Sequence, residues 1–244
     1  MIEQTKERLN QMKLFGALSS FDTRLNEGTQ HGWGNADFFS AVIDDEYLYR
    51  QERKTRRLIL SAKFRTEASF EKLDTTAKRN LSRSQISDFK NLTFLRSPRN
   101  VLILGPTGVG KTFLATAMGY QACRNGYSVQ FIGMNMFIEQ MAMSRISGTY
   151  LSLRKRLITV DLLIIDDLGI KPLSADAIQD FYDILEERFQ QHPTIITSQL
   201  PTSNWKEVIA DDVAYEAIMD RLIHTDLKIE LAGESYRRTL GGHQ

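Results

Sequence analysis

Cysteine and histidine are scarce in this chain of 244 residues, and long apolar runs are absent. The single cysteine, Cys123, cannot form a disulfide within the chain and is expected to be a small packing residue. The 4 histidines are scattered, without cysteine or carboxylate neighbours at ligand spacing, so the sequence predicts no structural zinc site. No apolar run approaches the roughly 20 residues that a membrane-spanning helix requires. These absences predict a soluble cytoplasmic protein.

The most informative motif is a glycine-rich segment at residues 105–112. It fits the Walker A pattern G-x4-G-K-[ST] and directly follows the apolar run at 101–104. Closely spaced glycines let successive backbone N–H groups point at phosphate oxygens, at the positive end of the helix that follows. Lys111 is expected to reach the β- and γ-phosphates of a nucleoside triphosphate, and Thr112 to ligate Mg²⁺. The predicted ATP-binding residues are Gly105, Pro106, Thr107, Gly108, Val109, Gly110, Lys111, Thr112 and Phe113.

From residue 101 onward the sequence alternates short β-type runs with segments of helix length. The runs lie at 101–104, 129–132, 162–165, 194–197 and 227–231. Strands that alternate with helices are joined by right-handed crossovers into a mostly parallel sheet with both faces covered. The sequence therefore predicts an α/β fold with a central, parallel, five-stranded sheet flanked by helices.

Two adjacent carboxylates end the third of these runs. Asp166 and Asp167 follow four apolar residues, about 50 residues after the Walker A segment, which fits a Walker B motif. At the carboxyl end of a buried strand, Asp166 can orient Mg²⁺ through water, and Asp167 can polarise the water that attacks the γ-phosphate. We therefore predict a metal site formed by Thr112 and Asp166, and a hydrolytic role for Asp167.

The fourth run ends in three polar residues, Thr197, Ser198 and Gln199. A polar side chain at this strand end can sit beside the γ-phosphate and the attacking water. The structural alternative is a strand-end hydrogen bond or a turn before Pro201. We favour the functional interpretation, with Gln199 ahead of Ser198.

Before the Walker A segment, the sequence predicts a small helical domain. Leu14, Leu18, Phe21 and Leu25 recur at the spacing of one helix face, and this helix is expected to end near Gly28. A second helix is expected to begin at 35–37 and to run into the basic stretch that follows. We predict two domains, a helical, basic one over residues 1–66 and a nucleotide-binding one over residues 67–244.

The two parts of the chain differ in charge. Residues 1–99 carry 18 lysines and arginines against 13 acids, whereas residues 100–244 carry 13 against 17. Because lysine and arginine displace the counterions condensed on nucleic acid, the basic part suggests a polyanionic partner. The aromatic residues do not alternate with basic ones as in a base-stacking surface, so duplex DNA is favoured over single strands.

Two basic groups are candidates for this contact. The first group, at residues 50–57, would share one side of a continuous helix, and Lys63 and Arg65 extend the positive stretch. Such a stripe can follow a phosphate backbone without reading bases. The second lies between the second and third β-type runs. The alternatives are a solvated helix face for the first and packing between subunits for the second. The predicted DNA-binding residues are Arg50, Arg53, Lys54, Arg57, Arg145, Arg154, Lys155 and Arg156.

Taken together, these motifs resemble a known family. The Walker A and Asp-Asp Walker B motifs, the strand between them, the polar end at 197–199 and the segments 12–16, 219–224 and 233–238 resemble the IstB-like AAA+ ATPases. Those proteins are the ATP-binding helpers of insertion-sequence transposases and are related to the DnaC helicase loader and the DnaA initiator. The resemblance covers nearly the whole chain, and its amino-terminal part is the looser match.

The resemblance implies roles for further residues. Arg221 would be an arginine finger that enters a neighbouring subunit's ATP site, with pairing to Asp220 or another acid as the alternative. Arg237 or Arg238 would sense the nucleotide of its own subunit. Phe70 and Leu73 resemble residues that line the adenine pocket, although core packing explains them nearly as well.

Two further implications concern the ATPase domain. The chain ends soon after these arginines, so it is expected to lack the carboxyl-terminal helical lid of many AAA+ proteins. The usual AAA+ Walker B motif ends in Asp-Glu, whereas here the second acid is Asp167, which predicts slow turnover.

The resemblance and the motifs together give one expected function. We expect an ATPase that hydrolyses ATP with Mg²⁺, forms a homo-oligomer with ATP at subunit interfaces, binds duplex DNA with little sequence preference and assists a transposase. The alternatives are a DnaC-like replicative helicase loader and, more distantly, a small-molecule kinase that uses the same phosphate loop.

Overall fold

The computed structural model describes residues 1–73, 80–223 and 227–233. It divides into two compact units, Met1–Arg57 and Leu58–Gln244. The sequence predicted a domain boundary after residue 66, whereas the two units divide after Arg57. The division comes earlier because the end of helix α3 (Asn35–Ala62) packs into the core of the second unit. There Ala62 is fully buried, and Leu58 and Ile59 pack against the same apolar cluster. No helix in the described ranges is long and apolar enough to cross a membrane.

The first unit consists of α1 (Ile2–Gln11), α2 (Phe15–His31) and most of α3. Helix α2 continues past Gly28, where the sequence predicted its end, and stops at Gly32, whose φ of 64° is left-handed. Gly16 lets α2 approach α3 closely, since a Cβ at this position would lie 2.5 Å from the Cβ of Tyr49. The buried carboxylate of Glu46 accepts a hydrogen bond of 2.7 Å from the Gly16 N–H and so caps the start of α2.

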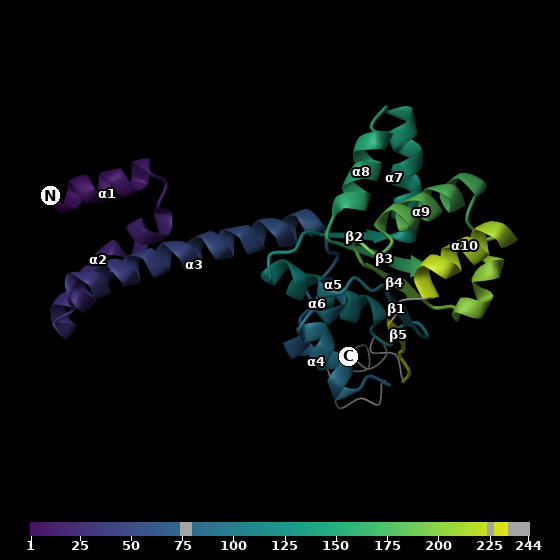
Figure 1. The fold of residues 1–244 in the computed structure, drawn as a ribbon, viewed down its shortest axis with the longest axis horizontal. Helices are drawn as coiled ribbons and strands as arrows, with labels where there is room; N and C mark the ends of the chain where they lie inside the picture. The colour runs from purple at the N-terminus through teal and green to yellow at the C-terminus, as the bar shows by residue number, and fades with distance from the viewer. Residues whose placement is uncertain (74–79, 224–226, 234–244) are drawn as a thin grey trace, which may run out of the picture. The chain divides into compact units, whose positions relative to one another are not determined.

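The second unit is built on a five-stranded, fully parallel sheet with the strand order β2-β3-β4-β1-β5 (Figure 1). This confirms the predicted α/β class. The strands are β1 (Val101–Leu104), β2 (Val129–Gly133), β3 (Leu162–Leu168), β4 (Thr194–Ser198) and β5 (Leu227–Glu230). Because β1 lies between β4 and β5, the loop that follows it opens at the carboxyl edge of the sheet beside the end of β4.

Alternate residues of the strands feed two apolar cores, one on each face of the sheet. Leu102 and Leu104 of β1 face one core, and Val101 and Ile103 face the other. The first core is covered by α7 (Met134–Ile146), α8 (Tyr150–Thr159), α9 (Ala175–Arg188), η2 (Thr202–Glu207) and α10 (Asp212–Ile223). The second is covered by η1 (Phe70–Lys72), α4 (Arg83–Lys90), α5 (Thr93–Arg96) and α6 (Lys111–Arg124).

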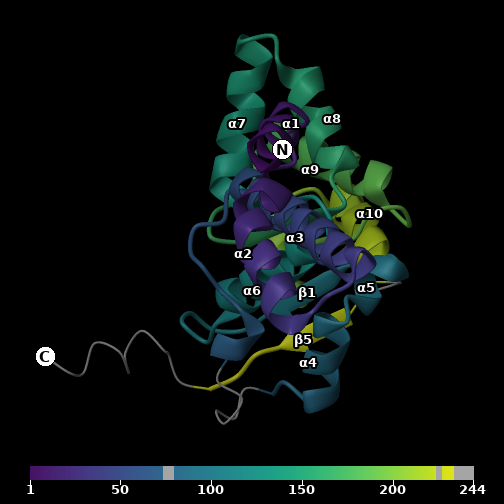
Figure 2. The same ribbon diagram turned by 90° about the vertical axis from the view of Figure 1, so that its left-hand side faces the viewer.

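Helices α7 and α8 form a hairpin after β2. They run side by side and are joined by a short turn that contains Gly148, with φ 70° (Figure 2). The base of the hairpin is fixed by Arg188 of α9, which is 1% exposed. Its guanidinium donates hydrogen bonds to the carbonyl oxygens of Leu157 at 2.8 Å and Val160 at 2.7 Å, so the last turn of α8 is held against α9.

Candidate active site

The phosphate loop joins β1 to α6 and owes its shape to glycines. Gly105, Gly108 and Gly110 have φ values of 142°, 87° and 99°, which side chains rarely allow. At Gly105 a Cβ would also overlap with the carbonyl oxygen of Leu231, which follows β5. The loop therefore requires glycine here for both conformation and space.

Lys111 is the first residue of α6, and its side chain lies in the turn of the loop. It is 5% exposed, and Nζ donates hydrogen bonds to the carbonyl oxygens of Gly105 at 2.8 Å and Pro106 at 2.9 Å. A lysine held in this way places a fixed positive charge at the amino terminus of a helix, where the helix dipole also favours anions. The arrangement is suited to a bound phosphate chain.

The loop is joined to the Walker B strand by a hydroxyl–carboxylate contact. Thr112 Oγ1 donates to Asp166 Oδ1 at 2.9 Å, and Thr197 Oγ1 from β4 donates to the same oxygen at 2.6 Å. Asp166 is 1% exposed, and this burial raises the pKa of its carboxyl above the ordinary value. The neighbouring charge of Asp167 acts in the same direction, whereas the two threonine hydroxyls oppose it.

This donor set fits a magnesium ion. Carboxylate and hydroxyl oxygens are the ligands that Mg²⁺ prefers, and Thr112 and Asp166 present both kinds within hydrogen-bond distance of each other. Among the described residues, no cluster of three or more His, Cys, Asp or Glu side chains forms an all-protein metal cage. Mg²⁺ commonly binds to one or two protein oxygens and to substrate phosphates, so two ligands suffice.

Asp167 has an unusual backbone conformation for a strand residue. Its φ is 62°, and the pairing of β3 with β4 becomes irregular between Ile165 and Leu168. Its N–H donates to Thr197 Oγ1 at 3.0 Å instead of to the regular β ladder. Irregularities of this kind re-aim a side chain, and here the half-buried Asp167 lies next to the buried Asp166 at the sheet edge.

Gln199 follows β4 and contacts the phosphate loop, because Thr107 Oγ1 donates to Gln199 Oε1 at 2.7 Å. Ser198 behaves differently: it is fully buried and donates to the carbonyl oxygen of Leu168 at 2.7 Å. That is the strand-end hydrogen bond considered as the structural alternative, and it involves Ser198 and not Gln199. The structure thus brings the side chain of Gln199, and not that of Ser198, to the loop, and the role of Gln199 in catalysis stays a prediction.

Arg221 lies in α10 and pairs with acids of its own chain. Nε donates to Glu186 of α9, Nη1 donates to Asp220 at 2.9 Å, and the guanidinium carbon lies 5.8 Å from the centre of the Tyr182 ring. Pairing with acids was the alternative to a finger role. A finger acts on a neighbouring subunit, so that role stays a prediction.

The remaining predicted nucleotide contacts are the two carboxyl-terminal arginines and two apolar residues before the phosphate loop. Arg237 and Arg238 lie outside the described residues. Phe70 is buried in the core on the α6 face of the sheet, and Leu73 packs against that core. Both residues thus pack in or against this core, and their place in an adenine pocket stays a prediction.

The predicted DNA-binding residues of α3 are all exposed but differ in their ion pairing. In α3, Arg53, Lys54 and Arg57 are exposed, whereas Arg50 is exposed but paired with Glu46 at 2.6 Å. Arg53 also lies over the ring of Tyr49, 5.7 Å from its centre. All four lie in one continuous helix, as predicted, and their contact with DNA stays a prediction.

Two of the four predicted basic residues of the α7–α8 hairpin are paired with acids of α9. Arg145 makes two hydrogen bonds to the buried carboxylate of Asp180, which also accepts one from the Tyr150 hydroxyl at 2.9 Å. Arg154 pairs with Glu187 at 3.4 Å. Lys155 and Arg156 are exposed. The structure therefore gives Arg145 and Arg154 a packing partner in α9 that the sequence did not suggest.

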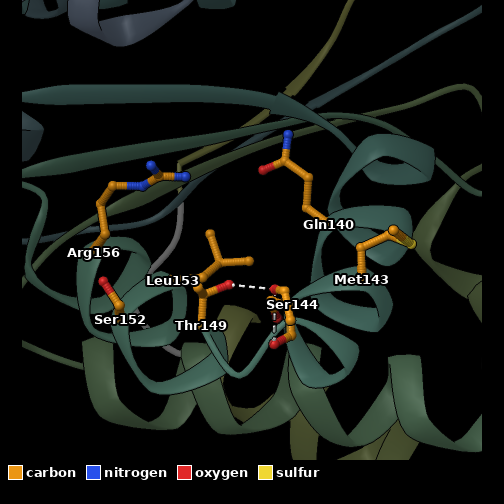
Figure 3. A pocket seen from close by; sticks show the side chains of 8 residues that line it. Gln140, Met143, Ser144, Thr149, Ser152, Leu153 and Arg156 are labelled. Atoms are coloured by element: carbon orange, nitrogen blue, oxygen red, sulfur yellow. Dashed lines mark hydrogen bonds between the residues drawn. The ribbon is translucent and has the colours of Figure 1, made fainter.

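Arg156 borders a shallow polar pocket between α7 and α8, about 320 Å³ in volume. Figure 3 shows its side chain near that of Ser152, whereas Gln140 and Met143 lie on the opposite side of the pocket. Its remaining lining residues are Met143, Ser144, Ser147 and Thr149.

Sequence reasoning missed two features of this site. Thr197 was noted only as part of a polar strand end, yet its hydroxyl contacts both Walker B acids. A hydroxyl in an otherwise apolar strand next to the Walker B strand was the available signal. Glu186, the partner of Arg221, carried no signal, because it is one of several acids on an amphipathic helix.

Comparisons with known proteins identify the family of the chain. The family model of IstB-like ATP binding proteins matches residues 7–241. The insertion sequence ATP-binding protein y4pL of Sinorhizobium fredii is 36% identical over 234 residues, which cover 96% of each chain.

Solved structures of replication proteins share the fold. The crystal structure of DnaI has a TM-score of 0.58 at 21% identity, over 74% of this chain and 92% of that chain. The replication initiator DnaA, bound to AMPPCP and single-stranded DNA, also has a TM-score of 0.58 at 21% identity, over 73% and 56% of the two chains. The second unit thus has the AAA+ P-loop fold of these neighbours, and with its family match from residue 7 to residue 241 the chain belongs to the IstB-like ATP binding proteins.

Proposed function

We propose that this chain is an ATP-hydrolysing AAA+ protein that assembles on duplex DNA and assists an insertion-sequence transposase. The proposal rests above all on the contact between Thr112 of the phosphate loop and Asp166 of the Walker B strand. That contact brings one proposed metal ligand from each motif together at the carboxyl edge of the sheet. The names of the relatives, which are insertion sequence ATP-binding proteins, support the link to transposition.

The chemistry that we propose divides the work among five side chains. Lys111 offsets negative charge on the β- and γ-phosphates. Thr112 and Asp166 hold Mg²⁺, which when bound supplies further positive charge to the phosphate oxygens. Asp167 accepts a proton from the attacking water or orients it, and Gln199 orients it from the loop side. The bond between the γ-phosphorus and its bridging oxygen breaks, and the products are ADP and inorganic phosphate.

Assembly would complete the site. We propose that Arg221 of one subunit reaches the γ-phosphate bound by the next subunit, where an arginine stabilises charge that develops during phosphoryl transfer. In the single chain the same guanidinium is held by Glu186 and Asp220. It must leave Glu186 to act as a finger, so nucleotide binding and subunit contact would compete with that ion pair.

The DNA contact that we propose runs along α3. Arg53, Lys54 and Arg57 are exposed there, and several copies of this stripe in an oligomer would sum weak backbone contacts into a high, salt-sensitive avidity. Lys155 and Arg156 would add contacts from the α7–α8 hairpin. Arg145 and Arg154 contribute less in this proposal, because their charges are paired with α9.

Sedimentation tests the function. The purified protein is spun with random-sequence duplex or with matched single-stranded DNA, each with and without ATP at one salt concentration. The proposal predicts large complexes only with ATP and duplex. Preference for the single strand would favour a helicase loader, and a monomer that ignores nucleotide and both DNAs would favour a small-molecule kinase.

A variant separates assembly from hydrolysis. Asp167→Asn removes the carboxylate proposed to act on water, so this variant should bind ATP and remain on duplex after the parent protein has dissociated. Asp88→Asn, which removes an exposed acid from α4, is the matched control and should dissociate like the parent. If Asp167→Asn hydrolyses ATP at the parent rate, Asp167 is not the group that acts on water.

A further inference from the structure

Two consecutive side chains after α3, Phe64 and Arg65, fill spaces left open by glycines. The ring of Phe64 stacks on Tyr120 of α6 with centres 4.6 Å apart. A Cβ on Gly119 would lie 2.7 Å from Cε1 of Phe64, so this contact requires glycine in α6. Phe64 also meets the ring of Phe131 in β2, with centres 6.2 Å apart. The chain just before Arg65 is therefore anchored on both α6 and the sheet.

Arg65 occupies the second space, at Gly133, the last residue of β2. A Cβ on Gly133 would overlap with Nη2 of Arg65 and would lie 3.2 Å from its Cζ. The guanidinium also lies near the ring of Phe131, 5.9 Å from its centre. Gly133 has an ordinary extended backbone, with φ −75° and ψ 146°, so its lack of a side chain serves space and not conformation.

This position puts a positive charge at the edge of the candidate active site. Gly133 is the register partner of Asp166 in the parallel pairing of β2 with β3. Side chains of register partners in parallel strands lie on the same face of the sheet, so the guanidinium over Gly133 lies on the face that carries the Asp166 carboxylate. Within the described part of the chain, Arg65 has no hydrogen bond or ion pair of its own.

We propose that Arg65 is a positioning residue of the ATP site, whose guanidinium, seated over Gly133, offsets the negative charge of the Walker B pair Asp166 and Asp167 and holds the pair in its working arrangement. The inference rests on the proposed hydrolysis of ATP. Two adjacent carboxylates repel each other, and a cation beside the buried one relieves this repulsion.

The proposal predicts which kinetic constant changes. The phosphate loop holds the triphosphate through its own backbone and Lys111, and Arg65 contacts neither. Loss of Arg65 should therefore leave the KM for ATP nearly unchanged and lower kcat, by about fivefold to twentyfold. Because Arg65 is exposed, its loss should barely change the melting temperature.

Four variants of the full chain test the proposal through ATP turnover with Mg²⁺. Arg65→Ala removes the charge, and Arg65→Lys keeps it and should recover most of the rate. Gly133→Ala leaves Arg65 in the chain, but the added Cβ occupies the space of its guanidinium, so this variant should lower kcat as Arg65→Ala does. Arg96→Ala removes another exposed arginine of the same unit and should turn over like the parent.

The double variant Arg65→Ala/Gly133→Ala provides the sharpest result. Both changes act through one guanidinium, so the double variant should be no slower than the slower single variant. Multiplied effects, or a Gly133→Ala variant with the parent kcat, would overturn the proposal. The proposal would also be overturned if the melting temperature of Arg65→Ala fell so far that unfolding of the variant explained its lower kcat. A parent protein that does not hydrolyse ATP at all would instead contradict the proposed function, which separates the two failures.

Discussion

Replacing Thr197 by valine should weaken both the fold and the proposed reaction. The hydroxyl is fully buried, donates to Asp166 Oδ1 at 2.6 Å and accepts from the Asp167 N–H at 3.0 Å. Thr197→Val keeps the shape of the side chain, so it opens no cavity. It removes the hydroxyl that most strongly lowers the pKa of Asp166, and it leaves the Asp167 N–H without its acceptor.

The magnitude follows from these two bonds. A hydrogen bond to a charged group contributes about 1.5–3 kcal/mol, and a buried N–H left unsatisfied costs about 1–3 kcal/mol. Part of this is recovered because the valine has no hydroxyl to desolvate, so we expect a loss of about 2–4 kcal/mol in the free energy of unfolding. If Asp166, then held by Thr112 alone, stabilises the transition state less by about 1.5–3 kcal/mol, ATP turnover falls by about tenfold to a hundredfold.

Two assays and one control check this reasoning. Urea denaturation gives the free energy of unfolding, and phosphate release gives the rate for the same preparation. Thr197→Ser keeps the hydroxyl and loses one methyl group, so it should retain most of the rate. A Thr197→Val variant with the stability and rate of the parent, or a Thr197→Ser variant damaged as badly, would refute the assigned contacts.

Three further predictions concern the same unit. Gly105→Ala should be destabilised by more than about 2 kcal/mol in chemical denaturation and should lose ATP affinity, because its φ is 142° and its Cβ would overlap with the Leu231 carbonyl. Because burial raises the pKa of Asp166 above 3.8, the folded parent loses stability as pH rises through that raised value. Asp166→Asn should therefore be more stable than the parent at pH 7 without Mg²⁺, with the difference shrinking as pH falls toward 3.8; equal stability at every pH would contradict this. Burial raises the pKa of the Cys123 thiol to about 12, so a thiol reagent at pH 8 should modify it only after unfolding, and rapid reaction of the native protein would show that the thiol is accessible.

The sequence predicted the five strands and the two Walker motifs because each is encoded by residues that are adjacent in the chain. Apolar runs of strand length fixed the five strands, and the order of glycine, lysine and threonine fixed the loop, since each glycine meets a backbone requirement of its own. Cys123 is buried, which agrees with its expected role as a small packing residue.

What the sequence could not predict depends on contacts between distant residues. The pairing of Arg145 with Asp180 and that of Arg221 with Glu186 each join residues 35 positions apart, and nothing in the sequence around an acid of α9 indicates its partner. From the sequence, Arg65 was assigned only to a basic stretch, because nothing in the sequence shows that the guanidinium of Arg65 occupies the space beside Gly133. The end of α2 was placed too early, since Gly28 is a turn residue in most contexts but here lies within the helix before Gly32.

Phosphate release from ATP with Mg²⁺ tests the central claim, hydrolysis at the phosphate loop, most directly. The parent protein should release phosphate slowly but measurably in the presence of duplex DNA. Lys111→Ala should abolish the release, whereas Lys171→Ala, which removes an exposed lysine beyond β3, should leave it unchanged. Equal rates for the parent and Lys111→Ala, or no release by the parent at any ATP concentration, would contradict the account.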